Sequence, residues 1–196
     1  MRYHGNMINA TELYVPDRRA WRAWLEANHA TEQSVWLVYD KGAGRALTYE
    51  AIVEEAVCFG WIDSVSGRVS ETQSKLYISR RKPKSAWSQS NKERVERLRA
   101  QGLMTPSGEQ AIAAAQANGA WVRLDASDRL ELPPDLVRQL EVNDAAKAFF
   151  EAMSPSSKRI ILEWIYAART QATQRKRISE TVELAARGIK THHQRQ

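Results

Sequence analysis

The chain reads Trp61-Ile62-Asp63-Ser64-Val65-Ser66 and then Lys75-Leu76-Tyr77-Ile78-Ser79 in the middle of its N-terminal half. Both runs are short and contain the β-branched and aromatic residues that are typical of strands. Because Gly67 follows the first run, we predict two strands joined through Gly67 as a hairpin or meander. A third strand, short and buried, is predicted at Ser34-Val35-Trp36-Leu37-Val38-Tyr39.

Helical patterns surround these strands, and each begins at a side chain that can accept a hydrogen bond from the first helical turn. The predicted N-caps are Asp17, Thr48, Ser90 and Thr105. Ser90-Asn91-Lys92-Glu93 has the spacing of a capping box, in which the serine and the glutamate each satisfy a free N–H group. The helix after Thr48 is expected to end before Gly60, because glycine adopts the left-handed conformation without strain.

The chain beyond Pro134 is helical in pattern. Helices are predicted over residues 145–153, from Ser154-Pro155 onward, and over residues 172–187. The fold class is therefore α+β: a small mixed body with a few-stranded sheet flanked by helices, followed by a helical C-terminal unit. The predicted domains are the body at 1–124, a linker at 125–133, a helical module at 134–190 and a tail at 191–196.

Positive charge is confined to two segments of the chain. Residues 80–99 hold eight Lys/Arg and two Glu, and residues 158–196 hold nine Lys/Arg and three Glu. Each segment therefore carries +6, whereas the rest of the chain sums to −6. This pattern indicates a basic patch that meets an anionic ligand or partner.

Composition narrows the class of protein. Cys58 is the only cysteine, so an intrachain disulfide is excluded and the thiol is expected to be a small core residue. No stretch approaches the ~20 apolar residues of a membrane span. Residues 1–10 lack the apolar run of a secretory signal. We therefore expect a cytoplasmic protein without a membrane span.

The sequence contains no recognisable catalytic set. His29 is the only internal histidine and lies near a helix end, where a structural role is expected; His4, His192 and His193 lie near the termini. A Ser-His-Asp triad would have to use His29, and no nucleophile elbow or phosphate-binding glycine motif is present. No metal-ligand spacing is present either. We predict no cofactor, no metal site and no catalytic residue.

Two motifs carry a resemblance to a known family, namely Cys58-Phe59-Gly60-Trp61-Ile62-Asp63-Ser64 and Arg81-Lys82-Pro83-Lys84-Ser85-Ala86-Trp87-Ser88. They resemble the YdeI/OmpD-associated family, small bacterial proteins often labelled bacteriocin-protection proteins. Further matching segments lie at 17–25, 47–51, 91–95, 102–108 and 149–184. The resemblance implies protection against bacteriocin-type peptides and a link to an outer-membrane porin, but it implies no defined reaction, cofactor or catalytic residue.

The candidate ligand site is the basic and aromatic loop between Arg80 and Arg94, together with the strand before it. Trp87 could stack on a ligand while the cations bind its phosphates or carboxylates, or it could pack in the core as a hydrophobic staple. Asp63 could supply an acid to a pocket, but pairing with an arginine or closing a turn is favoured. The predicted ligand-binding residues are Trp61, Asp63, Arg80, Arg81, Lys82, Lys84, Trp87, Asn91, Lys92 and Arg94.

Three functions follow, and the first is favoured. The protein binds an anionic ligand or an acidic protein surface through this loop without catalysis, and nucleic acid is one possible ligand. Alternatively, it is an enzyme for a small anionic metabolite, with Asp63 as acid–base; that hypothesis predicts a cleft between the Trp61–Ser64 strand and the basic loop. A third alternative is a protein-interaction scaffold that uses the last helix. The oligomeric state is left open.

Overall fold

The computed structural model describes residues 10–191, and its contacts divide the chain into two compact units. Unit 1 comprises residues 1–122 and unit 2 comprises residues 123–196. Each unit has its own hydrophobic core and is described by itself. The histidines at positions 4, 192 and 193, and the predicted tail beyond Thr191, lie outside the described residues.

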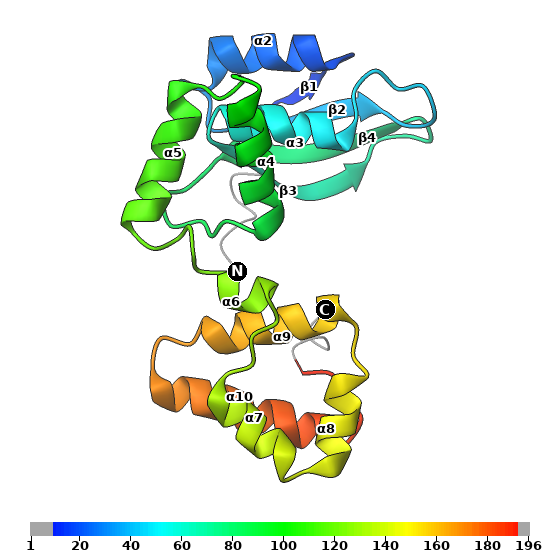
Figure 1. The fold of residues 1–196 in the computed structure, drawn as a ribbon. Helices are drawn as coiled ribbons and strands as arrows, with labels where there is room; N and C mark the ends of the chain where they lie inside the picture. The colour runs from blue at the N-terminus through cyan, green and yellow to red at the C-terminus, as the bar shows by residue number, and fades with distance from the viewer. Residues whose placement is uncertain (1–9, 192–196) are drawn as a thin grey trace. The chain divides into compact units, whose positions relative to one another are not determined.

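Unit 1 is built on a four-stranded mixed sheet with the strand order β1-β2-β4-β3 (Figure 1). Its strands are β1 Glu12–Tyr14, β2 Ser34–Asp40, β3 Trp61–Arg68 and β4 Gln73–Arg80. β1 runs parallel to β2, and the other two pairs are antiparallel. The predicted hairpin is confirmed as β3 and β4. Its turn lies beyond Gly67, however, because Gly67 is paired with Lys75 inside the ladder.

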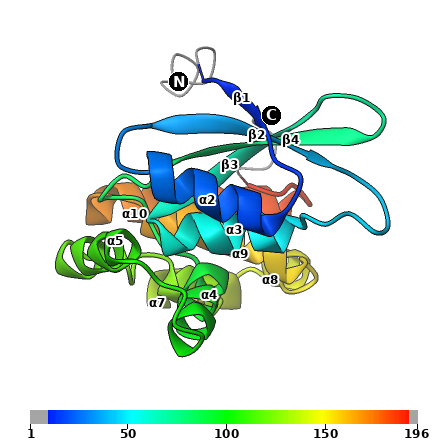
Figure 2. The same cartoon turned by 90° about the horizontal axis from the view of Figure 1, so that it is seen from above.

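Two helices, α2 Arg18–Asn28 and α3 Tyr49–Cys58, cover one face of this sheet (Figure 2). Val35, Leu37 and Ile78 are buried in the core on this face, together with Trp21 of α2. Successive side chains of a strand point to opposite faces. Their neighbours in β2 and β4, among them Tyr77, therefore point to the other face. Helices α4 Gln89–Ala100 and α5 Pro106–Ala117 complete unit 1.

The helix starts follow the sequence with one exception. Asp17, Thr48 and Thr105 are N-caps, as predicted, and each side chain accepts a hydrogen bond from the backbone three residues on. The capping box predicted at Ser90 is wrong. The N-cap of α4 is Ser88, whose backbone is extended and whose hydroxyl accepts from the N–H of Asn91 at 3.4 Å. An N-cap needs that non-helical backbone, and Ser90 already lies within the helix.

Gly108 fixes the start of α5 against the end of α3. A Cβ at this position would lie 2.3 Å from the backbone oxygen of Cys58. The same oxygen accepts hydrogen bonds from the backbone N–H and the hydroxyl of Thr105. The close approach of backbone to backbone therefore needs a residue without a side chain, and it places α5 beside Gly60 and Trp61.

We expect Gly108→Ala to destabilise unit 1 by about 1–3 kcal/mol, because the added methyl group overlaps a fixed carbonyl group. Helix propensity alone predicts the opposite, a gain of about 1 kcal/mol for alanine over glycine. Urea unfolding followed by tryptophan fluorescence measures the sign. Gln116→Ala, at an exposed position of the same helix, is the control and should change the free energy of unfolding by less than about 0.5 kcal/mol. A more stable Gly108→Ala variant would contradict the close packing.

Unit 2 is entirely helical over its described residues. Its helices are α6 Asp125–Asp128, α7 Pro134–Glu141, α8 Asp144–Glu151, α9 Pro155–Tyr166 and α10 Gln171–Ala186. The last three match the predicted helices, and α6 lies inside the predicted linker at 125–133. Leu136, Phe150, Ile161, Ile165 and Ile178 form the centre of its core. Among residues 10–191, no helix is long and apolar enough to cross a membrane.

Candidate functional site

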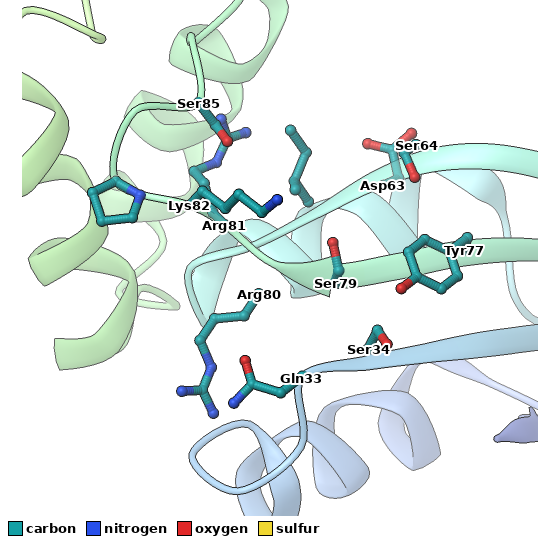
Figure 3. Close-up of a pocket in the computed structure, with 12 residues that line it drawn as sticks. Gln33, Ser34, Asp63, Ser64, Tyr77, Ser79, Arg80, Arg81, Lys82 and Ser85 are labelled. Atoms are coloured by element: carbon teal, nitrogen blue, oxygen red, sulfur yellow. The ribbon is translucent and has the colours of Figure 1, made fainter. Parts of the chain in front are cut away.

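A cavity of about 470 Å³ lies in unit 1, at the ends of β3 and β4 and the loop that follows them (Figure 3). It joins the first residues of β3 to the basic loop, which is the cleft that the enzyme hypothesis predicted. β2 and the chain before it add Ser34 and Gln33. The lining residues are Gln33, Ser34, Ile62, Asp63, Ser64, Tyr77, Ser79, Arg80, Arg81, Lys82, Pro83 and Ser85.

Arg81 is the unusual residue of this cavity because it is a buried cation. Its exposed fraction is 7%, and its guanidinium group stacks on the Trp87 ring, with Cζ 3.8 Å from the ring centroid. Nη1 donates to the backbone oxygen of Ala86 at 3.0 Å. Nε and Nη2 are buried and have no hydrogen-bond partner among residues 10–191. Burial lowers the pKa of Arg81 to about 10, and the Asp63 carboxylate opposes this effect.

The two unpaired groups of Arg81 form one edge of the guanidinium group, and two other arginines show what this edge binds. In Arg94, Nε and Nη2 donate to the two carboxylate oxygens of Glu50 at 2.9 and 2.7 Å. In Arg99, the same two atoms donate to Glu109 at 2.9 and 2.7 Å. Such paired bonds to a carboxylate or phosphate are short and strong. Arg81 thus has the same pair of N–H donors, Nε and Nη2, but no carboxylate or other acceptor among residues 10–191 binds them.

Of the two roles considered for Trp87, ligand stacking and core packing, the structure supports core packing. Its exposed fraction is 0%, and its ring packs against Arg81 on one side and against Trp121 at 5.1 Å. A base or ring of a ligand needs an accessible aromatic face. The alternative, core packing before the helix, is what the structure contains. Trp61 is buried to the same extent and meets Trp24 edge-on, so it too presents no face to a ligand.

Several predicted cations are bound to other parts of unit 1. Arg80 donates through Nη2 to three backbone oxygens, those of residues 29, 30 and 32, and so holds the loop before β2. Arg94 binds Glu50 and the side-chain oxygen of Asn91. Lys92 lies over the Trp121 ring. Lys82 and Lys84 are exposed, and only Lys82 of these two lines the cavity. Arg80, Lys92 and Arg94 therefore make contacts within unit 1, and Arg81 is the buried cation among them.

Asp63 has a different partner from the predicted arginine. Its Oδ2 accepts a hydrogen bond of 2.7 Å from the hydroxyl of Tyr49, the first residue of α3. Burial, and then this bond, raise the pKa of Tyr49 to about 12, so the phenol remains a donor at neutral pH. Figure 3 shows Asp63 and Ser64 on one side of the cavity and Arg81 and Lys82 on the other.

A second cavity of about 370 Å³ shares Arg80 and Arg81 with the first and is also lined by Trp61, His29 and Ser107. His29 Nδ1 lies 2.8 Å from the backbone oxygen of Leu25, and Nε2 lies 2.9 Å from the hydroxyl oxygen of Ser107. Since a carbonyl oxygen only accepts, Nδ1 carries the proton in the neutral ring and Ser107 donates to Nε2. His29 thereby ties the end of α2 to the start of α5, a structural role like the one expected for it.

The other features considered in the sequence were the Cys58 thiol, metal ligands and the basic face of the last helix. Cys58 is buried, and burial raises the pKa of its thiol to about 11, so it is not the thiolate that a reactive cysteine needs. Within the described ranges no group of three metal-ligating side chains lies together. In unit 2, Arg177 of α10 lies over the Trp164 ring, and Arg175 is 3.9 Å from Asp135. The basic face of α10 is therefore partly occupied by contacts within its own unit.

Sequence reasoning missed the polar groups that β2 and β4 bring to the cavity. Gln33, Ser34, Tyr77 and Ser79 belong to no motif, and only the antiparallel pairing of β2 with β4, Ser34 opposite Ser79, places them together. Tyr49 was also missed, although its position directly after the Thr48 cap was known. No pattern of neighbouring residues in the sequence identifies these cavity residues, because their proximity depends on the register of the strands.

Two family models match the chain. Residues 129–188 match the model described as bacteriocin-protection, YdeI or OmpD-associated. The chain therefore contains a YdeI/OmpD-associated domain. Residues 13–111, half of the chain, match a model described as a domain of unknown function (DUF8412), and the chain belongs to that family. No curated protein and no solved structure matches.

The YdeI/OmpD-associated match covers helices α7 to α10 of unit 2. It supports a bacteriocin-protection-like protein. Every residue that lines the two cavities instead falls within 13–111, the part that matches the domain of unknown function. The motifs at 58–64 and 81–88 lie there too. The candidate site therefore belongs to a part of the chain for which the matches give no activity.

Proposed function

We propose that unit 1 binds a small anionic ligand, without catalysis, through the Nε/Nη2 edge of Arg81. The observation that carries this proposal is the buried guanidinium group with two N–H donors that have no acceptor among the described residues. Buried polar groups are nearly always hydrogen-bonded, and an unpaired buried charge is costly. A carboxylate or phosphate group supplies the two acceptors and the opposite charge together.

The surroundings of Arg81 support a ligand from solution. Among the residues that the structure describes, Asp63 is the one carboxylate that lines the cavity, and Tyr49 already donates to it. Trp61 and Trp87 also have buried indole N–H groups without acceptors in the described part of the chain. These buried side-chain atoms without a partner are all donors, which favours an anion. Both family matches are compatible with this function, because neither names a reaction.

A small ligand fits these surroundings better than nucleic acid. Binding of a single strand combines a cationic groove with exposed aromatic faces, and Trp87 and Trp61 are both buried. Arg80 and Arg94 are committed to contacts within unit 1. A cavity of about 470 Å³ lies in the range of small-molecule sites, about 300–1,000 Å³.

Replacing Arg81 by lysine tests the proposal, because lysine keeps the charge but lacks the two parallel donors. We expect inorganic phosphate to bind the natural protein, and Arg81→Lys to weaken that binding at least about tenfold, equal to about 1.4 kcal/mol. Isothermal titration at fixed ionic strength measures both, since nonspecific attraction between exposed charges is screened by salt.

Arg99→Lys is the matched control. It makes the same exchange at an arginine whose edge already binds Glu109, so phosphate binding should not change. Phosphate and acetate that both fail to bind the natural protein, at low and at physiological salt, would reject the proposal. Binding that is unchanged in Arg81→Lys would assign it to charge alone, and binding that weakens equally in the two variants would show no specific effect of Arg81; either result would reject the role of Arg81.

The enzyme alternative keeps one specific observation in its favour, because Asp63 lines the same cavity as Arg81 and Lys82. Its Oδ2 is held by Tyr49, which makes the carboxylate a fixed acceptor. A fixed acceptor serves binding and acid–base chemistry equally well, so the geometry alone does not add a reaction to the proposed function.

A further inference from the structure

Side chains of opposite charge line the two sides of the cavity. Arg81 and Lys82 provide positive charge on the loop side, and Asp63 provides a carboxylate on the β3 side (Figure 3). Apart from Arg80, the rest of the lining is uncharged. It is apolar at Ile62 and Pro83, and its polar residues are Gln33, Ser34, Ser64, Tyr77, Ser79 and Ser85.

The charges of the lining restrict the charge of the ligand. Arg80, Arg81 and Lys82 are cations and Asp63 is an anion, so the lining sums to +2. A carboxylate would neutralise one of these charges, whereas a phosphate monoester, with a charge of about −1.5 to −2 at neutral pH, neutralises both. The low-dielectric surroundings of Arg81 make that difference larger than it would be in water.

Asp63 restricts the chemistry of the ligand at the other end. Asp63 lines the cavity and Tyr49 binds only its Oδ2, which leaves the second carboxylate oxygen as an acceptor for a ligand; the carboxylate repels any anionic group that approaches it. The ligand must therefore bring a hydroxyl or an amine to this side. An amine would add a positive charge to a lining that is already positive. A hydroxyl satisfies Asp63 without that penalty, and the serine hydroxyls can bind further hydroxyls in either direction.

We infer that the ligand is a phosphomonoester of a polyhydroxylated compound, such as a sugar or polyol phosphate. Its phosphate lies on the Nε/Nη2 edge of Arg81 with Lys82 beside it, and its hydroxyls reach Asp63 and the serines of β3 and β4. This inference rests on the proposed function, because it adds the ligand class to the same site. The uncharged polar residues of the lining would then contact the hydroxylated part of the ligand.

Titration with four compounds tests the ligand class: inorganic phosphate, glycerol 3-phosphate, glucose 6-phosphate and glucose. We expect at least one of the two esters to bind ten times or more tightly than inorganic phosphate, and glucose not to bind. Asp63→Asn should remove most of this advantage while leaving inorganic phosphate bound as well as before, or more tightly. Each variant is first checked for an unchanged melting temperature.

Asp40→Asn is the matched control, because Asp40 of β2 also accepts a hydrogen bond from a tyrosine, Tyr14, at 2.8 Å, and does not line the cavity. Should Asp63→Asn fail to fold, Tyr49→Phe frees the carboxylate from its fixed orientation without changing its charge. It should reduce the same advantage about threefold or more. The Asp40→Asn protein should retain the full preference for the esters.

The outcomes separate the two proposals. Inorganic phosphate that binds as tightly as both esters would overturn the ligand class and leave the Arg81 anion site intact. Esters that keep their advantage in Asp63→Asn would also overturn it, because Asp63 would then not read the hydroxyls. Failure of inorganic phosphate, acetate and both esters to bind would reject the proposed function itself.

Discussion

Replacing Glu55 by alanine will lower the free energy of unfolding by about 3–5 kcal/mol, the usual cost of removing one partner of a buried ion pair. The Glu55 side chain is only 2% exposed. It accepts a hydrogen bond of 2.6 Å from Nε of Arg18 and one of 2.8 Å from Nη1 of Arg22. Both arginines belong to α2 and Glu55 belongs to α3, so the carboxylate joins the two helices that cover the sheet.

The size of the destabilisation by Glu55→Ala should depend on the burial of the carboxylate. Glu26, a second carboxylate that pairs with Arg22, provides the test. Glu26 also pairs with Arg22, at 3.3 Å, but its side chain is 59% exposed. Exposed pairs contribute about 0–1 kcal/mol, so Glu26→Ala should change the free energy of unfolding by less than about 1 kcal/mol. Urea unfolding of both variants measures the difference. Equal effects of Glu55→Ala and Glu26→Ala would contradict the buried role of Glu55.

The sequence predicted the parts of the fold that depend on local physics. A side-chain acceptor before a helix and a glycine after it act within four residues, which is why Asp17, Thr48, Thr105 and Gly60 were placed correctly. Ser90 was misplaced because Ser88 offers the same local chemistry two residues earlier, and the choice between them depends on where the chain leaves its extended conformation. β1, with three residues, is too short to show a strand pattern.

A cavity lies beside the loop that the sequence singled out as the candidate site, but most of its lining could not be predicted. The loop after β4 was chosen for its cations, and it does line the cavity. The sequence did not show which arginine has an Nε/Nη2 edge without an acceptor among residues 10–191, because such pairs are distant in the chain: Arg94 is paired with Glu50, 44 positions away. Trp87 was ambiguous for the same reason. A tryptophan among cations can stack on a ligand or pack in the core, and only its contact with Trp121, from the segment after α5, favours core packing.

Arg81→Met will abolish phosphate binding and will leave the protein as stable as before, or more stable by up to about 2 kcal/mol. The reason lies in the balance of terms at Arg81. Burial lowers its pKa from 12.5 to about 10, which corresponds to a penalty on the order of 3 kcal/mol for keeping the charge inside. Against this stand the contact with the Trp87 ring, about 0.5–2 kcal/mol, and one hydrogen bond to the Ala86 oxygen, about 1 kcal/mol.

Arg81 and Glu55 are both buried and charged, but their removal should have opposite effects on stability. Glu55 is hydrogen-bonded by two arginines, whereas among the described residues no carboxylate is hydrogen-bonded to Arg81. Methionine replaces the side chain as far as the Nε position with flexible apolar atoms that fill irregular space, so most of the apolar packing of the arginine stem is kept. Phosphate affinity should fall at least about a hundredfold, equal to about 2.7 kcal/mol, while thermal and urea unfolding show no loss. A large destabilisation by Arg81→Met would mean that the guanidinium group has a structural role in unit 1. Lost phosphate binding without lost stability is the result expected of a residue that serves a ligand and not the fold, because binding sites often reduce stability.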